Sequence, residues 1–386
     1  MKIYLVGGAV RDKILGIPIK DRDYLVVGST PKEMVGLGYK PIGKDFPVFI
    51  HPKTQEEYAL ARTERKVGKG YHGFKFYTSP EVTLEEDLRR RDITINAIAE
   101  DQNGNIYDPF NGKDDIKNKI IRHVSDAFIE DPLRVLRVAR FTALDVKFRI
   151  HPETLKLMST MVLTGELKSL SVERVVAEIT KGLQGKNPEI MLDCLCNCGA
   201  LNEVLLDLPH GAPSFSEDFV RLGLAMKQST KSLEAESKLI MLLLASYFGK
   251  HYLPETHKIW IEKQKFLLKA LKISSLSVKI FWNIIDEELN LKNFSTLTAE
   301  EKLDCLYRLD FFRRPNIISE ILNIITVLYK AFEIEAQKFD NLNKLLILFL
   351  SEINQLKSEI DPSKPGGEIK EFVYQERLFA IKKISQ

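Results

Sequence analysis

The spacing of the apolar residues changes part-way along this chain of 386 residues. Up to about residue 120, short runs of alternating apolar and polar residues are separated by Gly, Pro and Asp, which is typical of β-strands joined by turns. From about Ile129 onward, apolar residues recur every three or four positions, which predicts helices. We therefore expect an α+β fold, in which a small mixed sheet with helices is followed by an all-α remainder.

The alternating part predicts short elements at defined positions. Strands are expected at residues 3–6, 23–27, 48–51, 57–61 and 106–107. Helices are expected at residues 10–15, 31–37 and 84–91.

The composition excludes two classes of protein. Hydrophobic residues make up 44% of the chain and charged residues 28%, which is enough apolar material for a core and excludes a wholly disordered chain. The longest apolar run without a charge covers residues 239–248, whereas a bilayer-spanning helix needs about 18 such residues. We therefore expect a cytoplasmic protein with no membrane partner. The net charge of +3 is too small to identify a partner by itself.

A glycine turn opens the first predicted helix. Glycines in the run Gly7-Gly8-Ala9-Val10-Arg11-Asp12 let the backbone approach a ligand closely. The N–H groups at the start of a helix favour an anion, and the fork-shaped guanidinium of Arg11 suits phosphate. A simple turn that binds nothing is the alternative interpretation.

Two carboxylates follow at the entry of the second predicted strand. Asp21 and Asp23 are two residues apart, so their side chains lie on one side of the strand. Like charges so close repel each other, and a divalent cation such as Mg²⁺ is the usual reason to keep both ionised. A solvated turn is the alternative, but the neighbouring glycine turn and Arg11 favour a metal. Glu57 heads a later strand and is a candidate for a third carboxylate or an ordinary surface residue.

Two basic segments complete this part of the chain. The segment Arg62–Lys66 precedes a stretch with glycines and aromatic residues at positions 68–76, which suits a flap over nucleotide or RNA and equally an ordinary hairpin loop. Arg89, Arg90 and Arg91 are consecutive, so they cannot all face one ligand. We expect Arg91 to reach phosphates and the other two to stay solvated.

The start of the helical part is the most informative segment. Pro132 suits the first turn of a helix and Asp131 suits its N-cap. Arg134, Arg137 and Arg140 recur every three residues and predict one cationic stripe. The residues expected on the buried side are Leu133, Leu136, Ala139 and Phe141. A solvated basic face is the alternative interpretation of the stripe.

One helical turn presents Asp131 and Arg134 together. An aspartate accepts hydrogen bonds and an arginine donates them. Cytosine and adenine each show an amino donor beside a ring-nitrogen acceptor, whereas uracil and guanine show the reverse. This pair is therefore able to accept C and A and to reject U and G, because a wrong base leaves buried polar groups unpaired.

These motifs together resemble those of class II tRNA nucleotidyltransferases, the bacterial CCA-adding enzymes. The resemblance is near-continuous over residues 1 to about 205, and residues 45–49 and 56–66 are similar to the gammaproteobacterial branch. Its motifs are Gly7–Asp12, Asp21-Arg22-Asp23, residues 90–97, Asp108-Pro109-Phe110-Asn111-Gly112 and residues 130–134. It implies a polymerase-β-like catalytic head at 1–120, a helical neck at 121–185 that recognises the base, a helical body at 186–275 and a helical tail at 276–386 that binds tRNA.

The resemblance also implies an activity and its residues. The activity is template-independent addition and repair of the 3′-terminal CCA of tRNA from CTP and ATP with Mg²⁺. The partner would be the tRNA 3′ acceptor end, bound along the helices mainly through its backbone and shape, and not DNA. Carried over position by position, the metal ligands are Asp21 and Asp23, the triphosphate contacts Gly8, Arg11 and Arg91, the base-reading pair Asp131 and Arg134, and the supporting residues Arg137 and Arg140.

The chain departs from these relatives in one region. Many members of that branch carry a C-terminal HD domain with metal-dependent phosphohydrolase activity, which needs a His-Asp pair and further ligands. No His-Asp dipeptide occurs in this chain, and residues 245–250 read Ala-Ser-Tyr-Phe-Gly-Lys where the family shows Cys-His-Asp-Leu-Gly-Lys. We therefore expect the phosphohydrolase activity to be absent.

Other functions remain open on the sequence. A poly(A) polymerase shares the head chemistry, and a partial enzyme that adds only CC or only A would share every motif. A catalytically silent RNA-binding protein is the rival from another class, although both aspartates and the base-reading pair argue against it.

Overall fold

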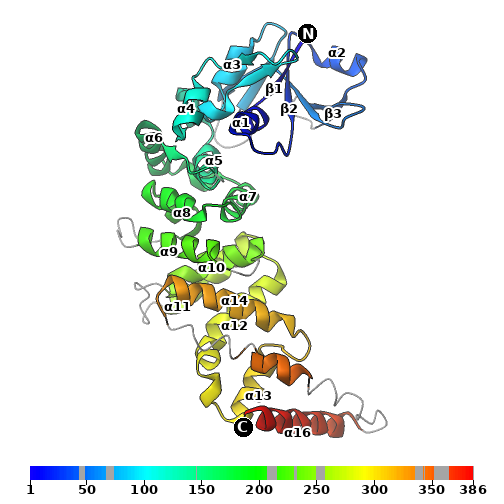
Figure 1. Cartoon of the computed structure of the whole chain (residues 1–386), viewed down its shortest axis with the longest axis vertical. Helices are drawn as coiled ribbons and strands as arrows, with labels where there is room; N and C mark the ends of the chain where they lie inside the picture. The colour runs from blue at the N-terminus through cyan, green and yellow to red at the C-terminus, as the bar shows by residue number, and fades with distance from the viewer. Residues whose placement is uncertain are drawn as a thin grey trace. The chain divides into compact units, whose positions relative to one another are not determined.

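The computed structural model divides the chain into two compact units, Met1–Ser216 and Glu217–Gln386, called unit 1 and unit 2 below. The structure describes residues 1–42, 48–66, 74–144, 146–206, 215–229, 233–248, 257–334, 342, 344–351 and 365–385. Figure 1 shows strands only in unit 1, and the described part of unit 2 is helical. An α+β part followed by helices is the architecture that the sequence predicts.

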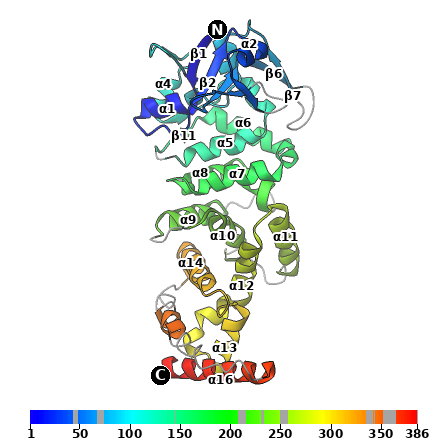
Figure 2. The same ribbon diagram turned by 90° about the vertical axis from the view of Figure 1, so that its right-hand side faces the viewer.

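A seven-stranded mixed sheet forms the N-terminal part of unit 1 (Figure 2). Only β2 and β5 pair in parallel, and the other neighbours are antiparallel. The strand order is β3 (Lys40–Ile42), β4 (Val48–Ile50), β5 (Glu57–Leu60), β2 (Asp23–Val27), β1 (Lys2–Val6), β8 (Ala99–Asp101) and β9 (Ile106–Tyr107).

Side chains alternate between two apolar layers on the two faces of this sheet, as the period of a strand requires. One layer contains Leu25 and packs against Leu88 of α3 (Leu84–Arg89). The other contains Val26 and packs against Met34 of α2 (Pro31–Gly36). Both helices begin with a capping box, in which the threonine before the helix and the glutamate three residues later satisfy each other's backbone N–H groups.

The described part of unit 1 also contains a separate hairpin and four helices that follow the sheet. The hairpin pairs β6 (Arg62–Lys66) with β7 (Phe74–Thr78), and the predicted flap at residues 67–73 lies outside the described residues. The helices that follow the sheet are α5 (Leu133–Thr142), α6 (Pro152–Leu163), α7 (Val172–Leu183) and α8 (Pro188–Asn197). α5 packs against both α7 and α8. As predicted, Leu136 and Ala139 of α5 are fully buried.

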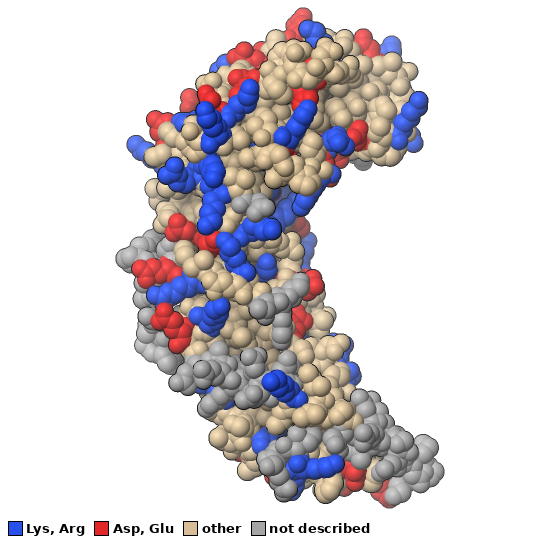
Figure 3. All heavy atoms as spheres, viewed as in Figure 1, with Lys and Arg blue, Asp and Glu red and all other residues tan. Residues whose placement is uncertain are grey.

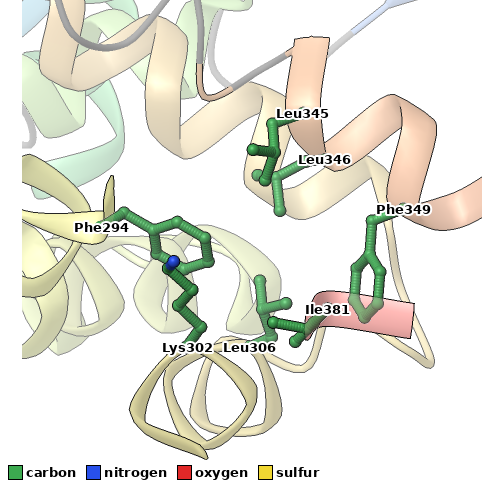
Figure 4. Close-up of a pocket in the computed structure, with 7 residues that line it drawn as sticks. All are labelled: Phe294, Lys302, Leu306, Leu345, Leu346, Phe349 and Ile381. Atoms are coloured by element: carbon green, nitrogen blue, oxygen red, sulfur yellow. The ribbon is translucent and has the colours of Figure 1, made fainter. Parts of the chain in front are cut away.

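Unit 2 is built from helices of different lengths. Its described helices are α9 (Phe215–Lys227), which starts just before the boundary, α10 (Ala235–Phe248), α11 (His257–Ala270), α12 (Ser275–Lys292), α13 (Ala299–Arg308), α14 (Asn316–Ala331) and α16 (Gly366–Ser385). α16 docks on α13, and a small apolar pocket lies beside this contact (Figure 4). The pocket is lined by Phe294, Lys302, Leu306, Leu345, Leu346, Phe349 and Ile381. Among the described residues, no helix combines the length and apolar character that crossing a bilayer requires.

Candidate active site

The strand register brings the glycine turn and the predicted metal ligands together. Val6, the last residue of β1, pairs with Asp23, the first residue of β2. The turn at Gly7 and the start of α1 (Gly8–Leu15) therefore lie next to Asp23. Gly7 has a φ of +70°, and a Cβ atom there would lie 2.9 Å from Nη1 of Arg91. Only glycine suits this position, because it needs both a left-handed backbone and room for the arginine.

The pKa of Asp23 is raised above its ordinary value. Burial raises its pKa, the nearby Arg91 opposes this rise, and the neighbouring Asp21 adds to it. Glu57 pairs with Asp23 across the parallel β2–β5 contact, so the two side chains lie on one face of the sheet. The structure thus places Asp23 beside the glycine turn, with Asp21 close enough to act on its pKa and Glu57 next to it on the neighbouring strand.

The carboxylates of Asp21 and Asp23 suit a divalent cation, but they do not form a complete coordination site by themselves. Mg²⁺ binds hard oxygen ligands and neutralises the repulsion between carboxylates, so the Asp21 and Asp23 side chains fit such an ion. In the described ranges, no three His, Cys, Asp or Glu side chains converge closely enough to hold a metal by themselves. Glu57 as a third ligand therefore stays a prediction.

Two of the three consecutive arginines, Arg90 and Arg91, form ion pairs with Asp87, which is fully buried. Burial alone would raise the pKa of Asp87, but Arg90 and Arg91 hold it below its ordinary value. Nη2 of Arg90 lies 2.5 Å from the carboxylate and Nη2 of Arg91 lies 3.4 Å from it. Arg91 thus lies between Asp87 and the glycine turn, and its contact with phosphates stays a prediction. The expectation that Arg90 stays solvated is wrong, because this ion pair holds it, whereas Arg89 is exposed and pairs with Glu85.

Arg11 is held by partners within unit 1. Its guanidinium donates to Oδ1 of Asp12 at 2.7 Å and to Oδ1 of Asn96 at 2.6 Å. The residue is 7% exposed, so most of its surface is covered by protein. The two bonds orient the Arg11 guanidinium next to Gly8, where a Cβ atom would lie 3.5 Å from Nη2 of Arg11.

The start of α5 differs by one residue from the prediction. Pro132, and not Asp131, occupies the N-cap position, although Oδ1 of Asp131 still accepts a hydrogen bond from the Leu133 N–H at 3.0 Å. Oδ2 of Asp131 accepts one from Nη2 of Arg174 on α7 at 3.2 Å. The carboxylate is therefore oriented by two donors.

The stripe of arginines on α5 docks against the rest of unit 1. Arg134 donates to the carbonyl oxygens of Ala127 at 2.8 Å and of Arg90 at 2.6 Å. Arg137 pairs with Asp92 at 2.7 Å. Burial alone would raise the pKa of Asp92, but this ion pair lowers it to about 2. The alternative of a solvated basic face is wrong, because the stripe joins α5 to the segment that carries Arg91.

The sequence did not single out two partners of this stripe, Arg174 and Glu178. Arg174 binds Asp131, and Glu178 lies 2.5 Å from Nε of Arg140. Both residues are on α7, four positions apart, so they lie on one face of that helix. The sequence signal that could have identified them is two charged residues four positions apart, next to the apolar residues of the same helix.

Models of two protein families match unit 1. The model described as "Poly A polymerase head domain" matches residues 3–122. The model described as "Probable RNA and SrmB- binding site of polymerase A" matches residues 147–211. The first covers the sheet and the glycine turn, and the second covers α6 to α8.

Curated relatives decide the family. A multifunctional CCA protein of Acinetobacter baumannii is 45% identical over 334 residues, which are 82% of this chain and 81% of that protein. The chain belongs to the multifunctional CCA protein family. The relative from Chromobacterium violaceum is 60% identical over 215 residues, 55% of this chain, and there the chain spans only 53% of the relative's length.

Solved structures of CCA-adding enzymes share the fold. The apo form I of one CCA-adding enzyme aligns with a TM-score of 0.67 at 21% identity and covers 99% of this chain and 86% of that one. The Bacillus stearothermophilus CCA-adding enzyme in complex with CTP aligns with a TM-score of 0.63 at 23% identity, covering 99% and 89%. The polymerase-β-like head and helical remainder predicted for this family member are thereby confirmed.

Proposed function

We propose that this chain adds and repairs the 3′-terminal CCA of tRNA, using CTP and ATP without a nucleic-acid template. One observation carries the proposal. Arg134 is hydrogen-bonded to the carbonyl of Arg90, and the next residue, Arg91, lies against the glycine turn beside Asp23. The first turn of α5, which suits recognition of C and A, is therefore hydrogen-bonded to the segment that suits binding of a triphosphate. A tRNA substrate implies a cytoplasmic site of action.

The residues around the glycine turn bind the reacting groups. Asp21 and Asp23 would hold Mg²⁺, which when bound neutralises phosphate charge and helps align the displacement at phosphorus. The backbone at Gly8 and the guanidinium of Arg91 bind and orient the triphosphate. Arg11, oriented by Asp12 and Asn96, adds positive charge to the same pocket. Positioning of this kind supplies much of the catalysis of nucleotidyl transfer.

The first turn of α5 selects the base. The carboxylate of Asp131 accepts a hydrogen bond from the amino group of cytosine or adenine, and the guanidinium of Arg134 donates one to the adjacent ring nitrogen. Arg174 supports this role by orienting the Asp131 carboxylate through its charge-assisted hydrogen bond. Arg137 and Arg140 flank the nucleotide from the following turns of the helix.

The tRNA binds through charge on the helices. Figure 3 shows lysine and arginine side chains gathered over the part of unit 1 where Figure 1 labels α3 to α8. Such a surface suits the phosphate backbone of the acceptor end. It carries no base-reading information, which fits a substrate recognised by shape.

Two related functions are distinguished by one assay. The family models that match unit 1 are named after poly(A) polymerase, and partial CC- or A-adding enzymes share the site. Purified protein is given tRNA that ends before CCA, with CTP, ATP or both, and the 3′ ends are sequenced. We expect CC with CTP alone and CCA with both nucleotides. Long A tails, or addition that stops at CC with both nucleotides present, would contradict full CCA addition.

We further propose that the phosphohydrolase activity of HD-domain relatives is absent. At the position of the family's His-Asp pair, Ser246 accepts a hydrogen bond from Nε1 of Trp260 at 2.9 Å. The Tyr247 ring lies 5.4 Å from the Trp260 ring and 6.4 Å from the His257 ring. Aromatic packing at this place supports the absence of a metal site.

Incubation with 2′,3′-cyclic AMP and Ni²⁺ tests this second proposal. We expect no hydrolysis above the rate without protein, because the ligands that would activate a metal-bound water are replaced. A relative that retains the His-Asp pair serves as the positive control. Product that depends on both this protein and Ni²⁺ would contradict the proposal.

A further inference from the structure

Three arginines of unit 1 surround one phenyl ring. Phe141, in the last turn of α5, is 4% exposed. The Cζ atoms of Arg140, Arg11 and Arg137 lie 4.3, 5.4 and 5.7 Å from the centre of its ring. Each distance is within the range of about 6 Å over which an aromatic face attracts a cation.

These cations need support, because three positive charges close to one ring repel each other. Each guanidinium has its own carboxylate, which neutralises part of its charge. The pairs are Arg11 with Asp12 at 2.7 Å, Arg137 with Asp92 at 2.7 Å, and Arg140 with Glu178 at 2.5 Å. The ring adds what the carboxylates cannot, which is one electron-rich group that all three arginines approach.

The ring also joins separate parts of unit 1. Arg11 belongs to α1, which follows the glycine turn, whereas Arg137 and Arg140 belong to the helix whose first turn suits base recognition. The three paired carboxylates lie on α1, on the segment before residue 94 and on α7. Phe141 is therefore the point at which the phosphate-binding arginine meets the arginines of the base-reading helix.

We propose that Phe141 is a positioning residue for nucleotide binding: its ring holds the guanidiniums of Arg11, Arg137 and Arg140 in place before CTP or ATP arrives. This inference rests on the function proposed above. Without the attraction of the ring, mutual repulsion spreads the three arginines, and binding must regroup them. Pre-organisation of this kind improves affinity without adding a contact to the ligand.

Fluorinated phenylalanines at position 141 test the inference. One to three ring fluorines withdraw electrons from the face while leaving an apolar ring of nearly the same size. We expect the Kd for CTP, measured calorimetrically with Ca²⁺ in place of Mg²⁺, to rise in steps, reaching about threefold to tenfold with three fluorines. Binding of tRNA and kcat at saturating nucleotide should change little, because the ring is buried and leaves almost no surface for tRNA or for the reacting atoms to contact.

Phe148 provides the matched control. It is 1% exposed, and no arginine or lysine lies over its ring among the residues that the structure describes. The same fluorinated residues at position 148 should leave the Kd for CTP unchanged. Phe141→Leu, which keeps apolar bulk without an aromatic face, should weaken CTP binding at least as much as three fluorines.

Two results would overturn the inference about Phe141. One is a Kd for CTP that stays flat or falls across the fluorinated series, and the other is an equal rise in both the 141 and the 148 series. Either result would leave CCA addition itself untouched. Failure of the unmodified protein to extend tRNA would instead contradict the proposed function.

Discussion

Replacing both Asp21 and Asp23 by alanine is expected to abolish nucleotide addition, lowering kcat/KM by about a thousandfold or more. The register of β1 and β2 holds Asp23 beside the glycine turn, and the raised pKa of Asp23 reflects burial and the nearby charge of Asp21, against the effect of Arg91. Without the two carboxylates, the cation that would neutralise the phosphates loses both of its proposed main ligands. The measurement is extension of tRNA lacking CCA, with tRNA affinity followed separately.

Two controls separate chemistry from folding in this experiment. Asp114→Ala removes an exposed carboxylate of α4 (Gly112–Asn118) and should keep activity within about twofold. Asp23→Asn should lose activity yet raise Tm at neutral pH without metal. The reason is that the folded-state pKa of Asp23 is raised, so at a pH above it the ionised carboxylate opposes folding. Addition that survives the double alanine change would refute the metal assignment.

Replacing Asp131 by asparagine is expected to relax base selection. The side chains have the same shape, but one acceptor oxygen becomes an amide donor. That donor no longer accepts from the amino group of cytosine and is able to donate to O4 of uracil, although Arg134 still opposes the uracil N3–H. We expect the ratio of kcat/KM for UTP to that for CTP to rise about a hundredfold, with a loss of CTP addition of similar size. Sequencing of the 3′ ends after incubation with all four nucleotides measures the change directly.

Asparagine is preferable to a truncation at this position. The Asp131 carboxylate accepts the Leu133 N–H at the start of α5, and an amide oxygen is able to accept the same bond. Arg149→Ala, an exposed cation in the same unit, is the matched control and should leave nucleotide choice unchanged. Asp131→Asn that still adds CCA faithfully would show that the base is read elsewhere.

Much of the candidate site could be proposed from the sequence because its chemistry lies in short, ordered motifs. Asp21 and Asp23 were proposed as metal ligands from their spacing at a strand entry, and the register of β2 with β5 places Glu57 beside Asp23. The strand β8 was not predicted, although it pairs with β1 on one side and with β9 on the other. Its sequence, Ala99–Asp101, is too short and too polar for an alternating pattern to identify it.

The partners of several arginines were not predicted from the sequence. Arg90 was expected to be solvated because three consecutive arginines cannot all face one ligand, yet the buried Asp87, three residues before it, holds it. The partners of Arg137 and Arg140 lie on other elements, so only the folded chain brings Asp92 and Glu178 to them. The arrangement of three arginines around Phe141 likewise depends on how α1 meets α5.

A crystal structure of the protein with CTP and a divalent cation would test the central claim most directly. The account predicts that the pairing edge of the cytosine lies within hydrogen-bonding distance, about 2.7–3.2 Å, of the Asp131 and Arg134 side chains. It also predicts that the triphosphate lies at the Gly7-Gly8 turn with the cation on Asp21 and Asp23. A cytosine bound away from Asp131 and Arg134, with its phosphates at that same turn, would contradict base selection by this pair.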